Sequence, residues 1–158
     1  MTPEAALQHW LDQRLDAASA QWLRESVATL KGGGTDRDLF RCISLASRKL
    51  GKAPLALDAA ALAVAEKARP GWDPAPWTVD QAARIRLLLA AATDSDTFVR
   101  RLDQLCATAD LDELVAFYCG LPIYPDPPRH RLRAAEGLRT NMKVVFEAVA
   151  HRNPYPAE

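Results

Sequence analysis

The chain has 158 residues, a length typical of one domain, and a domain of this size buries roughly 68–70% of the surface that its unfolded chain exposes. Lys and Arg total 20 and Asp and Glu total 20, so the formal net charge is zero. A neutral chain lacks an overall electrostatic attraction to nucleic acids or anionic membranes, which argues against a general nucleic-acid-binding protein.

Nothing in the sequence indicates secretion or insertion into a membrane. The N-terminus has no basic segment followed by an apolar run, and the longest strongly apolar stretch, 87–92, is far shorter than the ~18–20 residues of a membrane span. Cys42, Cys106 and Cys119 are an odd number, lie far apart and form no CxxC pair. These features predict a cytoplasmic protein with free thiols that pack as small apolar side chains.

Ala, Leu, Arg, Asp and Glu dominate the composition, and apolar residues recur three and four positions apart along most of the chain. A first helix is capped by Thr2, and a second, with Trp22 in its apolar stripe, ends at the glycines 32–34. A third begins with a capping box at Thr35 and ends at Gly51. The pattern therefore predicts an all-α fold.

The remaining elements follow the same rules. Residues 57–68 form an alanine-rich helix, and the loop 69–77 contains too much proline to be helical. Thr78 with Gln81, and Asp110 with Glu113, have the spacing of helix caps.

After a proline-rich break at 122–128, we expect one long final helix with a single apolar stripe: Leu138, Met142, Val145, Phe146 and Val149. The total is eight or nine short helices of about 11–16 residues. Short connections favour antiparallel packing, either in an irregular bundle or in a right-handed helical array.

Motifs that carry chemistry are missing or have simpler explanations. The glycines 32–34 lack the Lys-Ser/Thr ending of a phosphate loop and better suit the end of a helix. Asp110 and Glu113 suit acid–base chemistry, but capping is far commoner at this spacing. The histidines have no ligand partner three or four residues away and are expected at the surface or an interface: His9, His130 and His151. We predict no metal, no cofactor and no enzymatic activity.

Two tryptophans, Trp72 and Trp77, lie in the loop 69–77, outside the predicted helices. A tryptophan in a loop is usually a packing anchor. Two of them close to Arg84 are also suited to forming the floor of a pocket for a planar ligand. These three residues are therefore candidate binding residues.

Polar residues flank the apolar stripe of the predicted final helix. Arg139 falls at one edge of the stripe, Asn141 near the other, and Glu136 lies three positions before Arg139. Either Glu136 and Arg139 form a structural pair that joins this helix to its neighbour, or the group presents a fork to an anionic or hydroxylated ligand. The sequence leaves both interpretations open.

From Gly51 onward the chain carries distinctive segments in a fixed order: GKxPL from Gly51, RPGWDP from Arg69, WTVDQAAR from Trp77, TADxxE from Thr108, AEGLRTN from Ala135 and NPYPAE from Asn153. In these segments it resembles the EboA family, whereas residues 1–50 match only in being helical. The resemblance implies that residues 1–158 are a single EboA-like helical domain. It also implies that the C-terminal segment with which family members usually continue is missing here.

The resemblance implies a role in metabolite traffic, in which an indole-type or otherwise aromatic precursor of a secondary metabolite moves across the inner membrane. Partners encoded in the same gene cluster include a prenyltransferase-like membrane protein, a TatD-like metal hydrolase and sugar-isomerase-like proteins. It implies no catalytic residue.

Three hypotheses about function follow. The leading one is a non-catalytic binding or adaptor protein for such an aromatic precursor. The second is a scaffold that docks other proteins of the cluster. The third is an enzyme whose site has no familiar motif and uses Glu136, Asp110 or Glu113.

Overall fold

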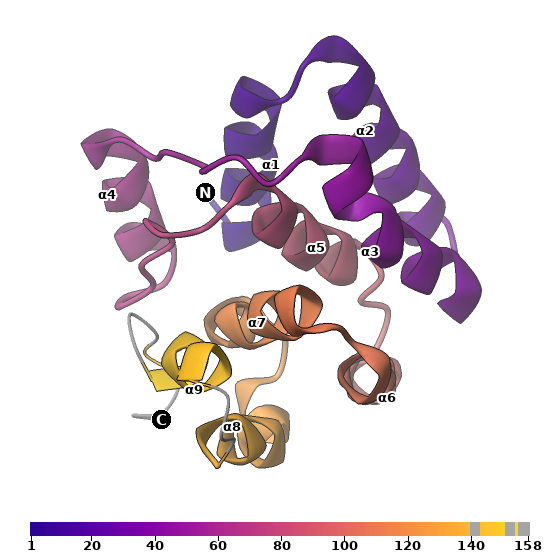
Figure 1. Ribbon diagram of the computed structural model, residues 1–158, viewed down its shortest axis with the longest axis vertical. Helices are drawn as coiled ribbons and strands as arrows, with labels where there is room; N and C mark the ends of the chain where they lie inside the picture. The colour runs from indigo at the N-terminus through magenta and orange to yellow at the C-terminus, as the bar shows by residue number, and fades with distance from the viewer. Residues whose placement is uncertain (140–142, 151–153, 155–158) are drawn as a thin grey trace.

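A computed structural model describes residues 1–139, 143–150 and 154 of the chain (Figure 1). In these residues the secondary structure consists of nine α-helices, two short 3-10 helices and one isolated β-bridge. The predicted all-α fold is confirmed. Within the described part of the chain, no helix is both long enough and apolar enough to cross a lipid bilayer.

The first three helices begin and end where local sequence signals predict. Thr2 and Thr35 accept hydrogen bonds at the N-termini of the first and third helices, and Asp38 completes the capping box. Gly32 and Gly51 end the second and third. The bounds are α1 Pro3–Arg14, α2 Ala17–Lys31 and α3 Asp36–Leu50.

The next four helices are also opened by polar caps. Asp58, Asp94 and Asp110 each accept a backbone N–H of the first turn, and Gln81 accepts the N–H of Thr78 at 3.0 Å. The capping expected of Asp110 is thereby confirmed. The bounds are α4 Ala59–Ala68, α5 Val79–Ala90, α6 Ser95–Thr108 and α7 Leu111–Cys119.

The expected long final helix is wrong, because the structure has two helices in its place. After the 3-10 helices Leu121–Ile123 and Pro127–His130, the chain forms α8 Arg131–Leu138 and α9 Lys143–Ala150, which pack against each other. A Cβ atom on Gly137 would lie 2.6 Å from side-chain atoms of both Tyr118 and Val149. The missing side chain thus lets α7, α8 and α9 approach closely, and this contact favours two short helices over one long one.

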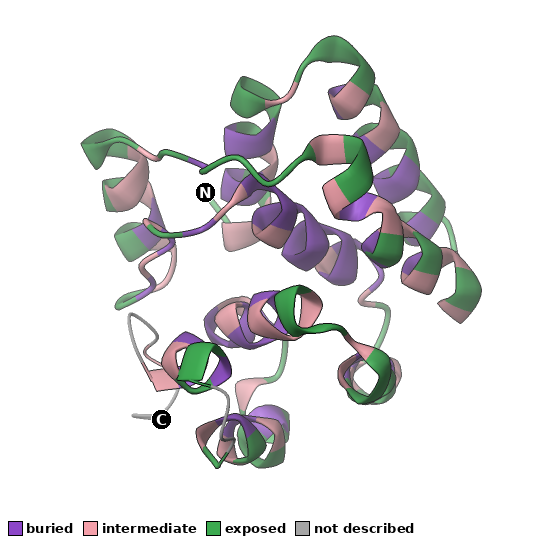
Figure 2. Cartoon of the chain, in the orientation of Figure 1, coloured by how far each residue is buried: buried purple, intermediate pink, exposed green. Residues whose placement is uncertain are grey.

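Helix α5 is the centre of the fold. It contacts α1, α2 and α3 on one side and α7 on the other, and α7 in turn contacts α6 and α9 (Figure 1). Almost every residue of α5 is buried, in contrast to the mixed exposure of the helices around it (Figure 2). Helices grouped in this way around one central helix form an irregular bundle.

Candidate functional site

The loop tryptophans lie in the core. The ring of Trp72 lies 5.6 Å from that of Trp10 in α1 and 5.7 Å from that of Trp77, measured between ring centroids. The three residues are 3%, 2% and 4% exposed in the order Trp10, Trp72, Trp77. Tilted and edge-on contacts at these distances are favourable between aromatic rings. We call these three residues the tryptophan cluster.

Two loops are held together beside the tryptophan cluster. The N–H of Leu55 donates to the carbonyl of Trp77 at 2.9 Å, and the N–H of Val79 donates to the carbonyl of Ala53 at 2.8 Å. These bonds flank the isolated bridge between Pro54 and Thr78. The bridge fixes Trp77 at the start of α5 and draws the buried Leu55 into the same core.

A small cavity of about 220 Å³ lies between α1, the loop before α4 and α4 itself. Trp10 and Arg14 line it, and Arg14 donates to the carbonyls of Leu55 at 2.9 Å and Ala56 at 2.7 Å. Ala56 has φ of 52°, a left-handed conformation that is costly for a residue with a side chain. Trp72 does not line this cavity, and its buried indole N–H has no acceptor among the described residues.

Arg84 lies inside the molecule, on the face of α5 that meets α3. Its guanidinium group bonds to the carboxylate of Asp80 at 3.2 Å, and the two side chains are 2% and 4% exposed. It also donates to the carbonyl of Ile43 at 3.2 Å. A buried cation needs such partners, because removing it from water is costly. The structure therefore does not bring Arg84 to a cavity beside the loop tryptophans.

Asp110 and Glu113 are held at the N-terminus of α7. Asp110 accepts the N–H of Glu113 at 2.8 Å, and this bond is the main cause of its lowered pKa. Burial is the main cause of a raised pKa at Glu113, and the neighbouring carboxylate of Asp110 adds to it. The pair is arranged as a cap rather than around an open cavity.

Of the two interpretations left open for Glu136 and Arg139, the structural pair between them is not the one seen, because Glu136 pairs with Arg133 instead. Glu136 accepts a hydrogen bond from Arg133 at 2.9 Å, and Arg133 also donates to Asp103 of α6 at 2.8 Å. Arg139 is exposed at the end of α8, where its Nε atom donates to the carbonyl of Ala135. Arg133, which no sequence signal singled out, is thus the residue that joins α8 to α6. Asn141 lies outside the described residues.

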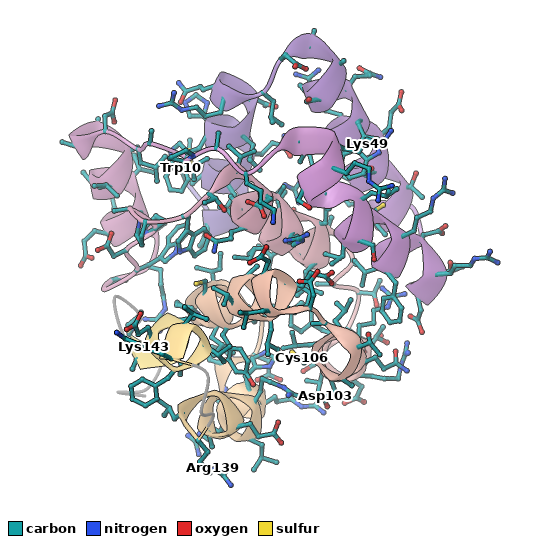
Figure 3. The ribbon with its side chains drawn as sticks, viewed as in Figure 1. Trp10, Lys49, Asp103, Cys106, Arg139 and Lys143 are labelled. Carbon is teal, nitrogen blue, oxygen red and sulfur yellow. The ribbon has the colours of Figure 1, made fainter. Side chains whose placement is uncertain are left out.

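The candidate residues therefore lie in three separate places. Trp72 and Trp77 belong to the tryptophan cluster, Arg84 lies between α5 and α3, and Glu136 and Arg139 lie on α8. Figure 3 shows two of these places far apart, with Trp10 of the tryptophan cluster labelled on the upper left of the molecule and Arg139 at its lower end.

The thiols and imidazoles of the described residues show no arrangement suited to metal binding. Burial raises the pKa of both Cys106 and Cys119 to about 12, and all three cysteines are free. His130 was expected at the surface or at an interface, but it is buried within the chain at 2% exposure, and its Nε2 lies 2.8 Å from the carbonyl of Pro125. The described residues contain no group of three or more His, Cys, Asp or Glu side chains that could hold a metal ion.

A groove between α2 and α3 is the feature that sequence reasoning missed. It has a volume of about 570 Å³, and Trp22, Cys42 and Leu45 supply its apolar part. All three are partly exposed, unlike the rings of the tryptophan cluster. Five charged side chains also line the groove: Glu25, Asp38, Arg41, Arg48 and Lys49. Lys49 marks its position on the upper right in Figure 3.

The pairing of two antiparallel helices builds this groove. Ser19, near the start of α2, donates to the carbonyl of Lys49, near the end of α3, at 3.2 Å. Trp22 lies about one helical turn after Ser19, so its ring faces the last turns of α3. A signal was present in the sequence, because α3 carries basic residues on the side opposite its apolar stripe. These basic residues alone did not predict a groove, because the sequence did not show that α2 lies beside α3.

The fold and the groove define an all-α protein with a ligand-sized, charged surface groove. Residues 4–158 match the model of a family described as "Metabolite traffic protein EboA", so the chain belongs to the EboA family. The match includes residues 4–50, which carry none of the distinctive sequence segments found from Gly51 onward. Neither a curated protein nor a solved structure matches the chain.

Proposed function

We propose that this chain is a non-catalytic binding protein in metabolite traffic, and that it holds an aromatic, indole-type precursor in the groove between α2 and α3. The observation that carries the proposal is a groove of about 570 Å³ with a partly exposed tryptophan in its wall. Sites for small molecules typically measure about 300–1,000 Å³ and combine aromatic walls with a few polar groups. Membership of a family described by metabolite traffic supports the same role.

The groove suits an aromatic ligand better than the tryptophan cluster does. A planar ligand gains most by stacking on a ring face that water would otherwise cover. Trp22 is partly exposed, whereas Trp72 and Trp77 are 2% and 4% exposed and already contact other rings. Admitting a ligand to the tryptophan cluster would require opening the core.

Isothermal titration calorimetry with indole and 3-methylindole tests this proposal. We expect dissociation constants below about 1 mM, an affinity of about 4 kcal/mol. Trp22→Ala should weaken binding at least tenfold, because it removes the stacking face. Trp72→Phe is the matched control: it keeps an aromatic ring in the core and should leave binding unchanged.

Two results would overturn the proposal. One is that neither compound binds more tightly than millimolar to the folded protein. The other is that Trp22→Ala binds as well as the original chain. Calorimetry is preferred to fluorescence here because the ligands and all four tryptophans share the same chromophore.

A second role, docking of other proteins encoded in the same gene cluster, is favoured by the surface of α8. Leu132 is 80% exposed there, and the side chain of Arg139 also faces solvent. Arginine is enriched at protein interfaces, and covering an exposed leucine with a partner removes apolar surface from water. Co-purification with the prenyltransferase-like membrane protein should weaken in a Leu132→Asp, Arg139→Ala variant that keeps its helical circular dichroism. Unchanged recovery of that partner would count against the docking role.

We also propose that the protein acts in the cytoplasm. Its three cysteines are free in the structure, which fits a reducing compartment. Cell fractionation checks this location, and recovery in a periplasmic or extracellular fraction would contradict it.

A further inference from the structure

About half of the Lys and Arg side chains that the structure describes form an ion pair with a carboxylate. Arg84 pairs with Asp80, Arg86 with Glu4, and Arg100 and Arg101 both with Asp36. The groove between α2 and α3 differs. Among the residues that the structure describes, Arg41, Arg48 and Lys49 have no ion-pair partner, and all three line this groove.

The two carboxylates of the groove are engaged by uncharged donors. Glu25 accepts a hydrogen bond from the side chain of Gln21 at 2.8 Å, and Asp38 accepts the N–H of Thr35 at 2.9 Å. Neither lies within ion-pair distance of a groove cation, and the charge of Arg41 acts on Asp38 only as a minor cause of its lowered pKa, after the hydrogen bonds from Thr35. Three cations against two carboxylates leave the groove with a net charge of +1, although the whole chain is neutral.

The positions of these cations suit a ligand that is apolar at one end and anionic at the other. Arg41 and Arg48 are seven residues apart, so they lie on one face of α3 about 10 Å from each other along the helix axis. Cys42 and Leu45 lie between them in the sequence and supply the apolar lining, opposite Trp22 on α2. An arginine fork binds a carboxylate or a phosphate through two parallel hydrogen bonds.

We propose that the groove between α2 and α3 selects an aromatic anion, whose ring stacks on Trp22 while its carboxylate or phosphate group binds Arg41, Arg48 and Lys49. This inference depends on the proposed function, since it names the chemical class of the ligand at the same groove. It predicts that affinity follows the charge of the ligand as well as its ring.

A set of indoles of similar size tests the charge preference. The neutral probe is 3-methylindole, the cationic probe is tryptamine, and the anionic probes are indole-3-acetate and indoxyl phosphate. We expect both anions to bind at least tenfold more tightly than 3-methylindole, and tryptamine to bind most weakly. A tighter complex with indoxyl phosphate than with indole-3-acetate would identify phosphate as the preferred group, and the reverse order would identify carboxylate.

Substitutions in α3 test whether the preference for anionic ligands arises in the groove. Arg41→Gln with Arg48→Gln should abolish the advantage of the anions over 3-methylindole, measured as the ratio of their dissociation constants within the same variant. Arg37→Gln is the matched control, because Arg37 is an exposed cation of the same helix that does not line the groove. The anion preference should also decline with added salt, since the screening length falls from about 10 Å at 0.1 M to about 3 Å at 1 M.

The outcomes separate this inference from the proposed function. If neutral and anionic indoles bind equally, or if the double variant keeps the anion preference, the charge selection is wrong while aromatic binding stands. If none of the four probes binds, both proposals fail. If anions bind but Trp22→Ala has no effect, the groove is not where the aromatic ring binds, and both proposals fail there as well.

Discussion

The tryptophan cluster and the groove between α2 and α3 use the same side chain in opposite ways. In the cluster, three indole rings exclude water and contact one another, and each is 4% exposed or less. In the groove, one indole ring remains partly exposed among charged side chains. The loop tryptophans, which looked available to a ligand in the sequence, form the core, and the tryptophan of a helix stripe borders the groove. The role of a tryptophan thus follows from its neighbours rather than from its local secondary structure.

The cations show the same contrast on the two faces of α3. Arg84 packs against the inner face, where it bonds to the carbonyl of Ile43 and to Asp80. Arg41 and Arg48 lie on the outer face with no ion-pair partner in the described part of the chain. A buried cation without a partner would destabilise the fold, whereas an exposed one costs little and remains available to an anion.

The difference between the tryptophan cluster and the groove is tested most directly by removing one tryptophan ring from each and comparing the loss of stability. Trp72→Ala should destabilise the protein by about 3–5 kcal/mol, because it leaves a cavity in a packed core. Trp22→Ala should cost much less, since water already reaches that ring. Urea denaturation measures both. Equal losses would mean that the groove ring is as much a part of the core as the cluster is.

The difference between buried and exposed cations is tested by removing the carboxylate of the buried pair between Asp80 and Arg84. Asp80→Asn leaves Arg84 without its carboxylate and should cost about 3–5 kcal/mol. The matched control is Asp112→Asn, which breaks the exposed ion pair with Lys52 and should have little effect. Thermal denaturation at neutral pH compares the two variants. Similar melting temperatures would show that burial does not distinguish these pairs.

A substitution in the loop beside the tryptophan cluster should raise the stability of the protein, by less than the two preceding variants lower it. Ala56 has φ of 52°, which costs an ordinary residue roughly 1–2 kcal/mol. Ala56→Gly should therefore stabilise the protein, by roughly 0.5–1 kcal/mol after the greater flexibility of glycine in the unfolded chain is counted. Denaturation in urea measures the gain. A loss of stability would mean that the methyl group contributes more through packing than its conformation costs.

At the start of α3, Asp36 pairs with two arginines, whereas Arg48 and Lys49 near the end of the helix have no ion-pair partner among the described residues. Bonds from Arg100 and Arg101 lower the pKa of Asp36 from 3.8 to about 2. A lowered pKa in the folded state means that this carboxylate stabilises the protein fully above about pH 4, and that the contribution is lost as the pH falls toward 2. Asp36→Asn should reduce stability at neutral pH and flatten its decline between pH 4 and 2. A decline as steep as in the original chain would exclude Asp36 as its source.

Local signals in the sequence predicted most helix boundaries, because caps act within one turn. Thr2, Thr35 and Asp110 cap the helices that they were expected to cap, and Gly32 and Gly51 end helices as expected. These residues satisfy backbone groups of their own helix, so no knowledge of the fold is needed to interpret them.

Features that depend on contacts between distant residues were not predictable. The break between α8 and α9 reflects the packing of Gly137 against Tyr118 and Val149, and a helical wheel of one segment cannot include that contact. His130 is buried against Phe98 and Tyr124, and its sequence neighbours gave no indication of this. The groove exists only because α2 and α3 lie side by side.

The central position of α5 has a consequence for how the chain folds. Helices α1, α2 and α3 all pack on α5, which begins only at Val79. During synthesis these helices leave the ribosome before the surface that completes their core, so the N-terminal part cannot reach its native packing until residues 79–90 have emerged. Once the chain is folded, the backbone amides of α5 can exchange with solvent only when the layers on both sides open. They should therefore be the slowest in the molecule in a hydrogen-exchange experiment.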